Sequence, residues 1–182
     1  MSLPHALLTA LTERPSSGSD LAARFDRSID YFWHATHQQI YRELARMEAA
    51  GLIESLPEES TRGRKRAYRI LAAGRRELKR WLAGAAAPTP LHDEMMVRLW
   101  AEAAVGPTRL KDSLVERRAA HEAQLALYRQ FEQRDFTPPP TDRERALRHV
   151  VLQAGMRYEQ YWIETLTGAL AALDRPAAPA GA

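Results

Sequence analysis

The sequence predicts a mostly α-helical protein in two parts, with one short β-hairpin in the first part. Apolar residues recur at intervals of three and four along most of the 182 residues, which is the period of amphipathic helices. Two short apolar runs between residues 52 and 71 flank a polar, basic segment, as in a hairpin. Small residues and prolines in GAAAPTP, residues 84 to 90, predict a linker between the two parts.

The bulk composition restricts the class of protein. The chain is 45% apolar and long enough to bury one or two cores. It has no cysteine, which excludes disulfides, zinc ribbons and a cysteine nucleophile. The run MSLPHALLTALTERP has no basic leader, and no stretch of about eighteen apolar residues occurs. We therefore expect a cytoplasmic protein that does not enter a membrane.

The positive charge lies mainly in the first part. The net charge is +3, yet residues 1 to 83 hold 14 Lys or Arg against 10 Asp or Glu. Between Arg62 and Arg80 nine residues are basic, and only Glu77 is acidic. This density suits a polyanion such as nucleic acid. A solvated basic face is the alternative that charge alone leaves open.

The first 35 residues predict two short helices. Leu3 to Thr12 has apolar residues at helical spacing, and Pro15 to Gly18 then interrupts the helix. Asp20 to Arg27 is a second short helical stretch. The aromatic run at 31 to 33 precedes the next helix, and we expect it to pack in the core.

A third helix has clear end signals. Thr36 and Gln39 form a T-x-x-Q capping box, in which each side chain accepts a hydrogen bond from the other's backbone N–H, so the helix is predicted to begin at His37. Gly51 stands where a left-handed residue ends a helix. Both ends of this helix are therefore predicted from side-chain and backbone chemistry.

The same helix has two distinct faces. Ile40, Leu44 and Met47 recur at intervals of four and three, which defines the buried face. The flanks carry a glutamine and a tyrosine. The opposite face is polar or small: Gln38, Arg42, Ala45, Arg46 and Ala49.

A basic hairpin follows the third helix. Leu52 to Leu56 and Arg66 to Leu71 are predicted strands, and helical spacing resumes from Arg75 to Leu82. The tip sequence RGRKR, residues 62 to 66, combines a glycine with four cations, a shape that reaches a minor groove or straddles phosphates. Directly after a capped helix, such a hairpin indicates a wing, and residues 1 to 83 a winged helix-turn-helix domain.

The chemistry of this domain predicts binding to double-stranded DNA. An α-helix fits the major groove, where Gln and Arg side chains match the edges of adenine and guanine. For the helix taken alone, ordinary surface residues are the alternative. The residues expected to bind DNA are Thr36, His37, Gln38, Gln39, Arg42, Arg46, Arg62, Arg64, Lys65 and Arg66.

The second part, residues 91 to 174, is predicted as a helical dimerisation arm. Leu91 to Ala104 is nearly apolar throughout, which predicts burial on more than one side. A long polar helix runs from Pro107 to about Gln133, and DFTPPPT ends it. The last helix, Asp142 to Leu173, keeps an apolar three-and-four spacing over about four heptads. Residues 175 to 182 are predicted as a disordered tail.

The apolar stripe of the last helix predicts a homodimer. Two long antiparallel helices with such a stripe need a partner, and a second copy of the chain is the simplest one. A two-fold dimer would read a pseudo-palindromic operator. The expected dimer contacts are Val151, Ala154, Tyr158, Tyr161, Trp162, Thr165 and Leu166.

Catalysis and metal binding find no support in the sequence. His34 and His37 straddle a capping threonine and would not share a helix, which argues against a metal site. No nucleophile elbow, Walker loop or GxGxxG motif occurs. We expect a protein that is not an enzyme and needs no cofactor. The alternative from another class is a coiled-coil interaction adaptor whose basic hairpin binds an acidic protein, without the steep salt dependence of a DNA binder.

Several motifs stand in a characteristic order along the chain. They are Gly18, Trp33, IYREL at 40 to 44, Glu48, GLI at 51 to 53, Arg64 to Arg66 with Tyr68, Gly74, Trp81 with Leu82, LVERRAAHEAQLALY, and Gly155, Glu159 and Trp162 in GMRYEQYWIETL. In this order they resemble the PadR family of bacterial winged-helix regulators over about residues 3 to 173. Two positions depart from that family. Ser19 replaces a tyrosine, and Leu71 replaces the threonine that caps the helix after the wing, so its capping oxygen is missing or comes from a neighbour.

The resemblance implies a homodimeric transcriptional repressor that a small aromatic or hydrophobic effector releases. It places the helix from His37 in the major groove and Tyr41 near the phosphate backbone. Methionine and aromatic side chains adapt to flat apolar ligands. The candidate effector residues are Met95, Met96, Trp100, Tyr158 and Trp162, which would equally suit a dimer core.

Overall fold

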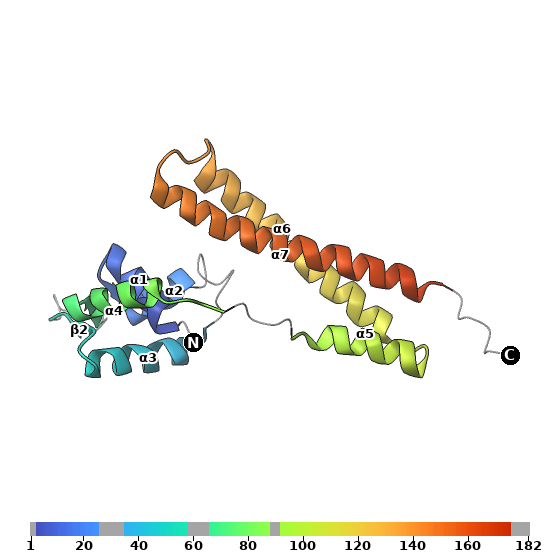
Figure 1. Ribbon diagram of the computed structural model, residues 1–182, viewed down its shortest axis with the longest axis horizontal. Helices are drawn as coiled ribbons and strands as arrows, with labels where there is room; N and C mark the ends of the chain where they lie inside the picture. The colour runs from blue at the N-terminus through green and yellow to red at the C-terminus, as the bar shows by residue number, and fades with distance from the viewer. Residues whose placement is uncertain (1–2, 26–34, 58–65, 88–91, 176–182) are drawn as a thin grey trace. The chain divides into compact units, whose positions relative to one another are not determined.

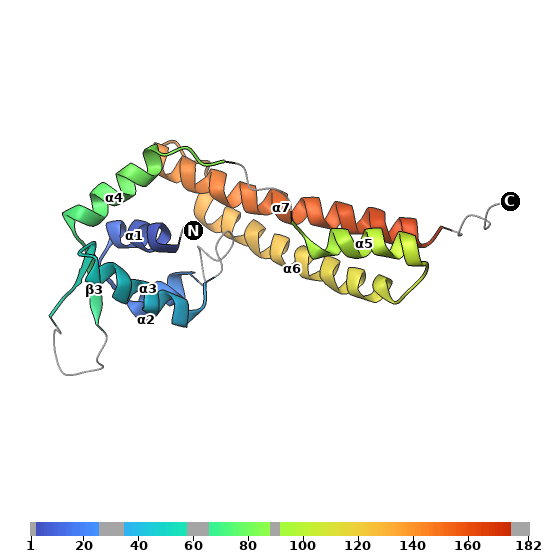
Figure 2. The same ribbon diagram turned by 60° about the horizontal axis from the view of Figure 1, so that its bottom comes forward.

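The computed structural model describes residues 3–25, 35–57, 66–87 and 92–175 (Figures 1 and 2). The chain divides into two compact units, Met1–Pro88 and Thr89–Ala182. The boundary falls within the segment predicted as a linker. The aromatic run at 31 to 33, the wing tip and most of the predicted tail lie outside the described residues.

The first unit contains helices around a small sheet. Among the described residues its strands form one antiparallel sheet in the order β1-β3-β2. The predicted hairpin is confirmed, since Ile53 pairs with Ile70 and Ser55 with Tyr68. The elements are α1 (Leu3–Glu13), β1 (Ser16–Ser17), α2 (Gly18–Arg24), α3 (His37–Ala49), β2 (Ile53–Ser55), β3 (Ala67–Ile70) and α4 (Ala72–Ala83).

Helix α2 begins earlier than predicted because the residues before it both pair with β3 and supply the helix cap. The predicted break at 15 to 18 contains β1, whose Ser16 and Ser17 pair with β3. Ser17 then caps α2, since its Oγ accepts a hydrogen bond from Asp20 N at 3.1 Å. The helix therefore begins at Gly18, two residues earlier than predicted.

The capping box of α3 is confirmed. Thr36 Oγ1 accepts from Gln39 N at 3.2 Å, and Thr36 N donates to Gln39 Oε1 at 2.9 Å. Gly51 follows the helix with a φ of 66°, the left-handed conformation that glycine adopts without steric cost. These two signals set the length of α3 and the direction in which the chain enters β2.

Helix α4 begins at Ala72, three residues earlier than predicted. Leu71 precedes it without a side-chain hydrogen bond to the helix, so the capping oxygen is indeed missing. The first turn closes through Arg75 N, which donates to Leu71 O at 3.1 Å. Gly74 permits this start because a Cβ there would lie 2.3 Å from Leu52 O. The helix thus packs directly on the backbone that precedes β2.

The second unit is a bundle of long helices. It contains α5 (Glu94–Val105), α6 (Leu110–Phe136) and α7 (Arg143–Leu173). Helices α6 and α7 run antiparallel and side by side, and α5 lies along one end of this pair (Figures 1 and 2). Its core consists of Met95, Leu110, Leu114, Trp162, Leu166 and Leu170. Within the described residues, no helix has the length and apolar character needed to cross a membrane.

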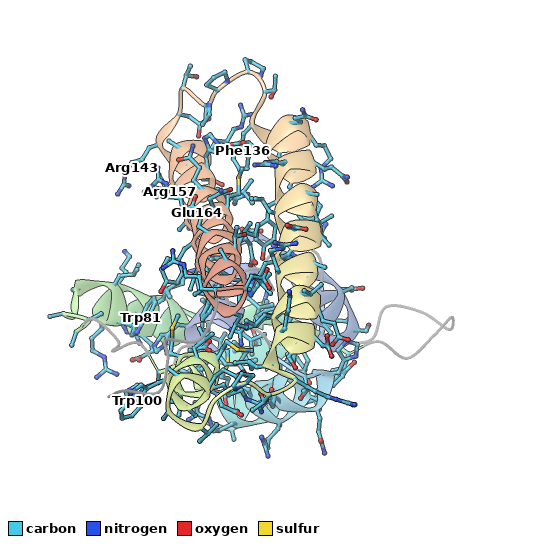
Figure 3. The ribbon with its side chains drawn as sticks, turned by 90° about the vertical axis from the view of Figure 1, so that its right-hand side faces the viewer. Trp81, Trp100, Phe136, Arg143, Arg157 and Glu164 are labelled. Carbon is cyan, nitrogen blue, oxygen red and sulfur yellow. The ribbon has the colours of Figure 1, made fainter. Side chains whose placement is uncertain are left out.

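The prediction that α5 is buried on more than one side is wrong for a single chain. Met95 is buried, but Val97, Trp100 and Val105 are 60%, 78% and 75% exposed. Trp100 lies on the outer side of α5 (Figure 3). The helix contacts the α6–α7 pair along one stripe, so the rest of its apolar surface faces away from the core of its own unit.

The close approach at Gly74 predicts a large effect of adding one methyl group. We expect Gly74→Ala to lower the free energy of unfolding by about 1–3 kcal/mol, because the new Cβ would overlap backbone that cannot easily move. Urea denaturation followed by circular dichroism measures this difference. The control is Gly168→Ala, where nothing lies within 4 Å of the added Cβ. That change should stabilise α7 by up to about 1 kcal/mol. Equal effects at the two positions would contradict the packing described for α4.

Candidate nucleic-acid interface

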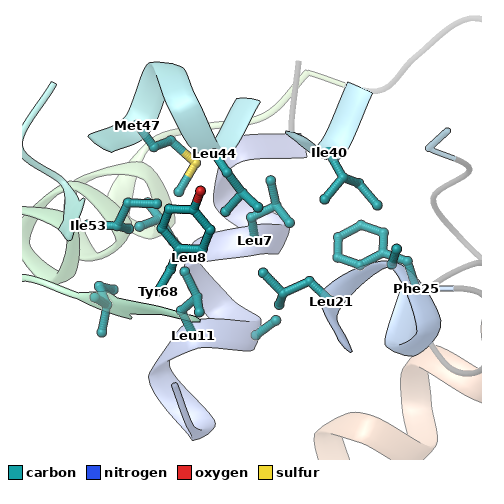
Figure 4. Packing of buried hydrophobic residues seen from close by; sticks show 13 residues of the cluster. Leu7, Leu8, Leu11, Leu21, Phe25, Ile40, Leu44, Met47, Ile53 and Tyr68 are labelled. Atoms are coloured by element: carbon teal, nitrogen blue, oxygen red, sulfur yellow. The ribbon is translucent and has the colours of Figure 1, made fainter. Parts of the chain in front are cut away.

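The orientation of α3 follows from its buried face. Ile40, Leu44 and Met47 are fully buried; Ile40 and Leu44 face Leu7 and Leu21 of the preceding helices, and Met47 lies beside Tyr68 (Figure 4). Burying each such side chain contributes about 1.5–3 kcal/mol. The opposite face is therefore held in solvent. The residues of α3 and its cap that were predicted to bind DNA are all exposed: Thr36, His37, Gln38, Gln39, Tyr41, Arg42 and Arg46.

Contacts within the protein distinguish the two arginines of α3. Arg46 Nε donates to both carboxylate oxygens of Glu43 at 3.1 Å. The hydrogen bond and charge of Glu43 raise the pKa of Arg46. Arg42 has no acidic partner among the described residues. Arg42 is therefore the cation of α3 that is available to a ligand without breaking an ion pair.

Tyr41 lies at the junction of α3 and α2. A Cβ on Gly18 would stand 2.3 Å from Tyr41 Cε1, so the ring packs directly over the first residue of α2. The side chain is still 48% exposed. Only glycine at position 18 leaves the ring in this place, which explains why the second helix begins with a glycine.

The base of the wing is tied to α3. Arg66 Nη2 donates to both oxygens of Glu48 at 2.8 Å and to Ser55 Oγ at 3.0 Å. Arg66, which was predicted to contact DNA, makes these hydrogen bonds within the unit. Arg62, Arg64 and Lys65 lie outside the described residues. A separate ion pair, Arg69 with Glu54, joins the two strands of the hairpin.

The predicted dimer residues of α7 fall on two different faces. Trp162 and Leu166 are fully buried in the core of one chain, so their assignment to a surface between copies is wrong. The residues at three-and-four spacing include some that face the core of the unit and some that face solvent, and the spacing alone does not distinguish these two sets. The residues that remain accessible are Val151, Ala154, Tyr158 and Tyr161, with Thr165 half-buried.

The five candidate effector residues are divided between the core and the surface of the second unit. Met95 and Trp162 belong to the core, and Met96 is packed against it. Trp100 and Tyr158 are exposed. The role of these residues in binding an effector stays a prediction, because burial alone does not show which side chains contact a ligand.

A polar network around Trp162 was not predicted from the sequence. The guanidinium of Arg117 lies 4.3 Å from the centre of the Trp162 ring and donates to Asp93 Oδ2 at 2.8 Å. His121 stacks on the same tryptophan with ring centres 5.8 Å apart, and its Nδ1 is 2.5 Å from Glu159 Oε2. The signal was present, since arginine and histidine interrupt the apolar spacing of α6 at these two positions.

Asp93 holds α5 onto this network. Its Oδ1 accepts from Met95 N at 2.8 Å and caps α5, while its Oδ2 accepts from Arg117. Burial alone raises the pKa of Asp93, but these hydrogen bonds and the charge of Arg117 outweigh burial and lower it. The carboxylate is therefore charged at neutral pH.

The pKa of Asp93 is lower in the folded state than the ordinary aspartate pKa of 3.8. The ion pair therefore stabilises the protein fully at pH values above 3.8. This stabilisation is lost as the pH falls through the lowered pKa of the folded state. Asp93→Asn keeps a capping oxygen but loses the charge. We expect it to cost about 1–2 kcal/mol at pH 7, with the difference shrinking toward low pH in urea denaturation. The control is Asp142→Asn. Asp142 caps α7, and its Oδ1 accepts a hydrogen bond from Arg145 N at 2.8 Å. A loss at Asp93 that does not depend on pH would contradict the ion pair.

Known proteins resemble both units of the chain. Residues 7–80 match the family model described as "Transcriptional regulator PadR-like family", and residues 91–174 match "Virulence activator alpha C-term". A Mycobacterium tuberculosis protein described as "Probable transcriptional regulator Rv1176c" is 38% identical over 185 residues, covering 93% of this chain and 98% of that protein.

Solved structures share the fold. The Vibrio cholerae virulence activator AphA is 32% identical with a TM-score of 0.81, over 95% of this chain and 98% of that one. Bacillus subtilis PadR, solved in complex with operator DNA, is 24% identical with a TM-score of 0.80, over 96% and 100%. The same protein solved with p-coumaric acid gives a TM-score of 0.75 at 24% identity, over 96% and 100%. By its sequence relatives, this chain belongs to the PadR-like family of transcriptional regulators.

Proposed function

We propose that this transcriptional regulator binds double-stranded operator DNA as a homodimer, with α3 in the major groove and the wing beside it. The observation that carries the proposal is the exposed face of a capped helix whose other face is fully buried. The complex of Bacillus subtilis PadR with operator DNA supports it. The two copies of α3 in a two-fold dimer would lie about 34 Å apart and read a pseudo-palindrome. The protein acts in the cytoplasm, and we assign it no catalytic role.

Arg42 is the proposed base-reading residue, because the other arginine of α3 is paired with Glu43. We expect Arg42→Ala to reduce the preference for the recognised duplex over a scrambled one by about 1–3 kcal/mol, as for the loss of a bidentate base contact. The duplex is obtained by letting the wild-type protein select from a random library. Fluorescence anisotropy then measures both affinities.

The matched control is Arg46→Ala, which removes a cation from the same helix without removing the proposed base contact. It should change the preference much less. If Arg42→Ala weakens binding to both duplexes equally, Arg42 contacts phosphate and reads no base. Wild-type protein that selects no duplex, or binds without steep salt dependence, would favour the adaptor and contradict DNA recognition.

The homodimer is proposed to form on the exposed apolar surface of the second unit. A soluble monomer rarely exposes large apolar patches, yet α5 and α7 leave many such side chains in solvent. The surface comprises Val97, Trp100 and Val105 of α5 and Val150, Val151, Tyr158 and Tyr161 of α7.

Two substitutions on α7 separate the dimer surface from the core. We expect Val151→Arg to give a folded monomer in sedimentation, because a charge would be buried between the two copies. Trp162→Arg should instead unfold the second unit, since that ring fills the core of one chain. Helicity measured by circular dichroism distinguishes the two results. A Val151→Arg protein that remains a dimer would place the interface elsewhere.

The regulator is further proposed to act as a repressor that a small aromatic effector releases. The structure of Bacillus subtilis PadR with p-coumaric acid supports this for a protein of the same fold. In this chain, Trp100 and Tyr158 are the exposed candidates for contact with an aromatic ring. An effector site that uses them would form on the outer surface of the helices and not inside the core around Trp162.

A further inference from the structure

We propose that Glu48 is a positioning residue that fixes the wing relative to α3, and that Arg66 serves this contact instead of binding DNA. The inference rests on the proposed DNA binding and deepens it. It concerns how two contacts with the duplex, one from the helix and one from the hairpin, are held in a single geometry.

One carboxylate joins three segments of the first unit. Glu48 lies in the last turn of α3. Its Oε1 accepts a hydrogen bond at 3.0 Å from the backbone N–H of Ser55, which is the last residue of β2. Both of its oxygens accept from Arg66 Nη2 at 2.8 Å, just before β3 begins. The end of the helix and both sides of the hairpin therefore meet at this side chain.

The chemistry of the contact requires a charged acid. Hydrogen bonds from the Ser55 side chain and backbone, together with the charge of Arg66, outweigh burial and lower the pKa of Glu48. The carboxylate accepts at both of its oxygens. A neutral amide offers a single acceptor oxygen, so it cannot bind the guanidinium in the same way.

Arg66 is held in place from several sides. The same Nη2 that binds Glu48 also donates to Ser55 Oγ at 3.0 Å. The guanidinium carbon lies 5.6 Å from the centre of the Tyr68 ring, within the range of a cation–π contact. The Nη2 group is thereby committed to Glu48 and Ser55, so a phosphate would have to compete with the carboxylate for it.

The contact lies where the hairpin departs toward its tip. The ladder of β2 and β3 continues as far as Leu56 N, which donates to Ala67 O at 2.8 Å. Residues 58 to 65, the tip, follow directly. Glu48 ties this end of the ladder to α3. A helix and a wing that bind neighbouring grooves must keep such a fixed relation.

The hairpin contains a matched control. Glu54 and Arg69 form an ion pair of the same kind that joins β2 to β3, and among the described residues neither makes a hydrogen bond or ion pair with α3. Glu54→Gln removes one negative charge, as Glu48→Gln does, without breaking the link between the hairpin and α3. Glu48→Gln and Glu54→Gln therefore differ in the link to α3.

The test measures the affinities of full-length variants for the selected duplex and for a scrambled duplex over a range of salt concentrations. We expect Glu48→Gln and Arg66→Ala each to lower the preference for the selected duplex about three- to tenfold, and the double variant no further than either alone. Glu54→Gln should keep the wild-type preference. Thermal melting confirms that each variant folds.

The salt slope distinguishes positioning from direct contact. Arg66→Ala should keep the slope of the wild type, because the guanidinium releases no counterion from DNA. Glu48→Gln should steepen it, since the freed Arg66 can then reach phosphate. A structural role confined to stability would leave both slopes and both preferences unchanged, and would overturn the proposal.

Two other results overturn the proposal in distinguishable ways. Arg66→Ala could reduce the salt slope by the amount expected for one phosphate contact, both in the wild-type background and in the Glu48→Gln background. In that case Arg66 binds phosphate itself. If the wild-type protein selects no duplex, the proposed function fails, and the positioning role fails with it. If the wild-type protein selects a duplex but Glu48→Gln behaves like Glu54→Gln, the positioning role alone is contradicted.

Discussion

The packing of Ile40, Leu44 and Met47 against α1 and α2 decides what the rest of α3 does. These side chains are fully buried, so the helix cannot rotate about its axis without exposing apolar surface to water. The capping box at Thr36 and the left-handed Gly51 fix its two ends. Every polar residue on the outer face is presented to solvent by this one constraint.

The protein uses several of its polar side chains to hold its own structure. Gln39 completes a capping box, Arg46 pairs with Glu43, and Arg66 binds Glu48. These residue types also suit recognition of DNA, so their chemistry alone does not show which role they have. The partners found in the structure leave Arg42 as the candidate for base reading on α3, and they support the positioning role that we propose for Glu48 and Arg66.

The sequence predicted the features that depend on short-range chemistry, and it missed those that depend on distant partners. The α3 boundaries follow from residues three apart, and the hairpin follows from alternating strands around a turn. Strand β1 has two residues, too few for any periodic signal. The Glu48–Arg66 pair joins residues 18 positions apart, and the burial of Trp162 depends on which side of α7 meets α5 and α6. No local pattern contains this information.

Nuclear magnetic resonance of the full-length protein, titrated with its selected duplex, tests the central claim most directly. If the outer face of α3 enters the major groove, the largest changes in backbone amide shifts should fall at residues 36 to 46, with smaller changes in β2 and β3. Changes confined to the helices of the second unit would contradict the account. They would show that the duplex binds a surface other than the one that the buried face of α3 presents.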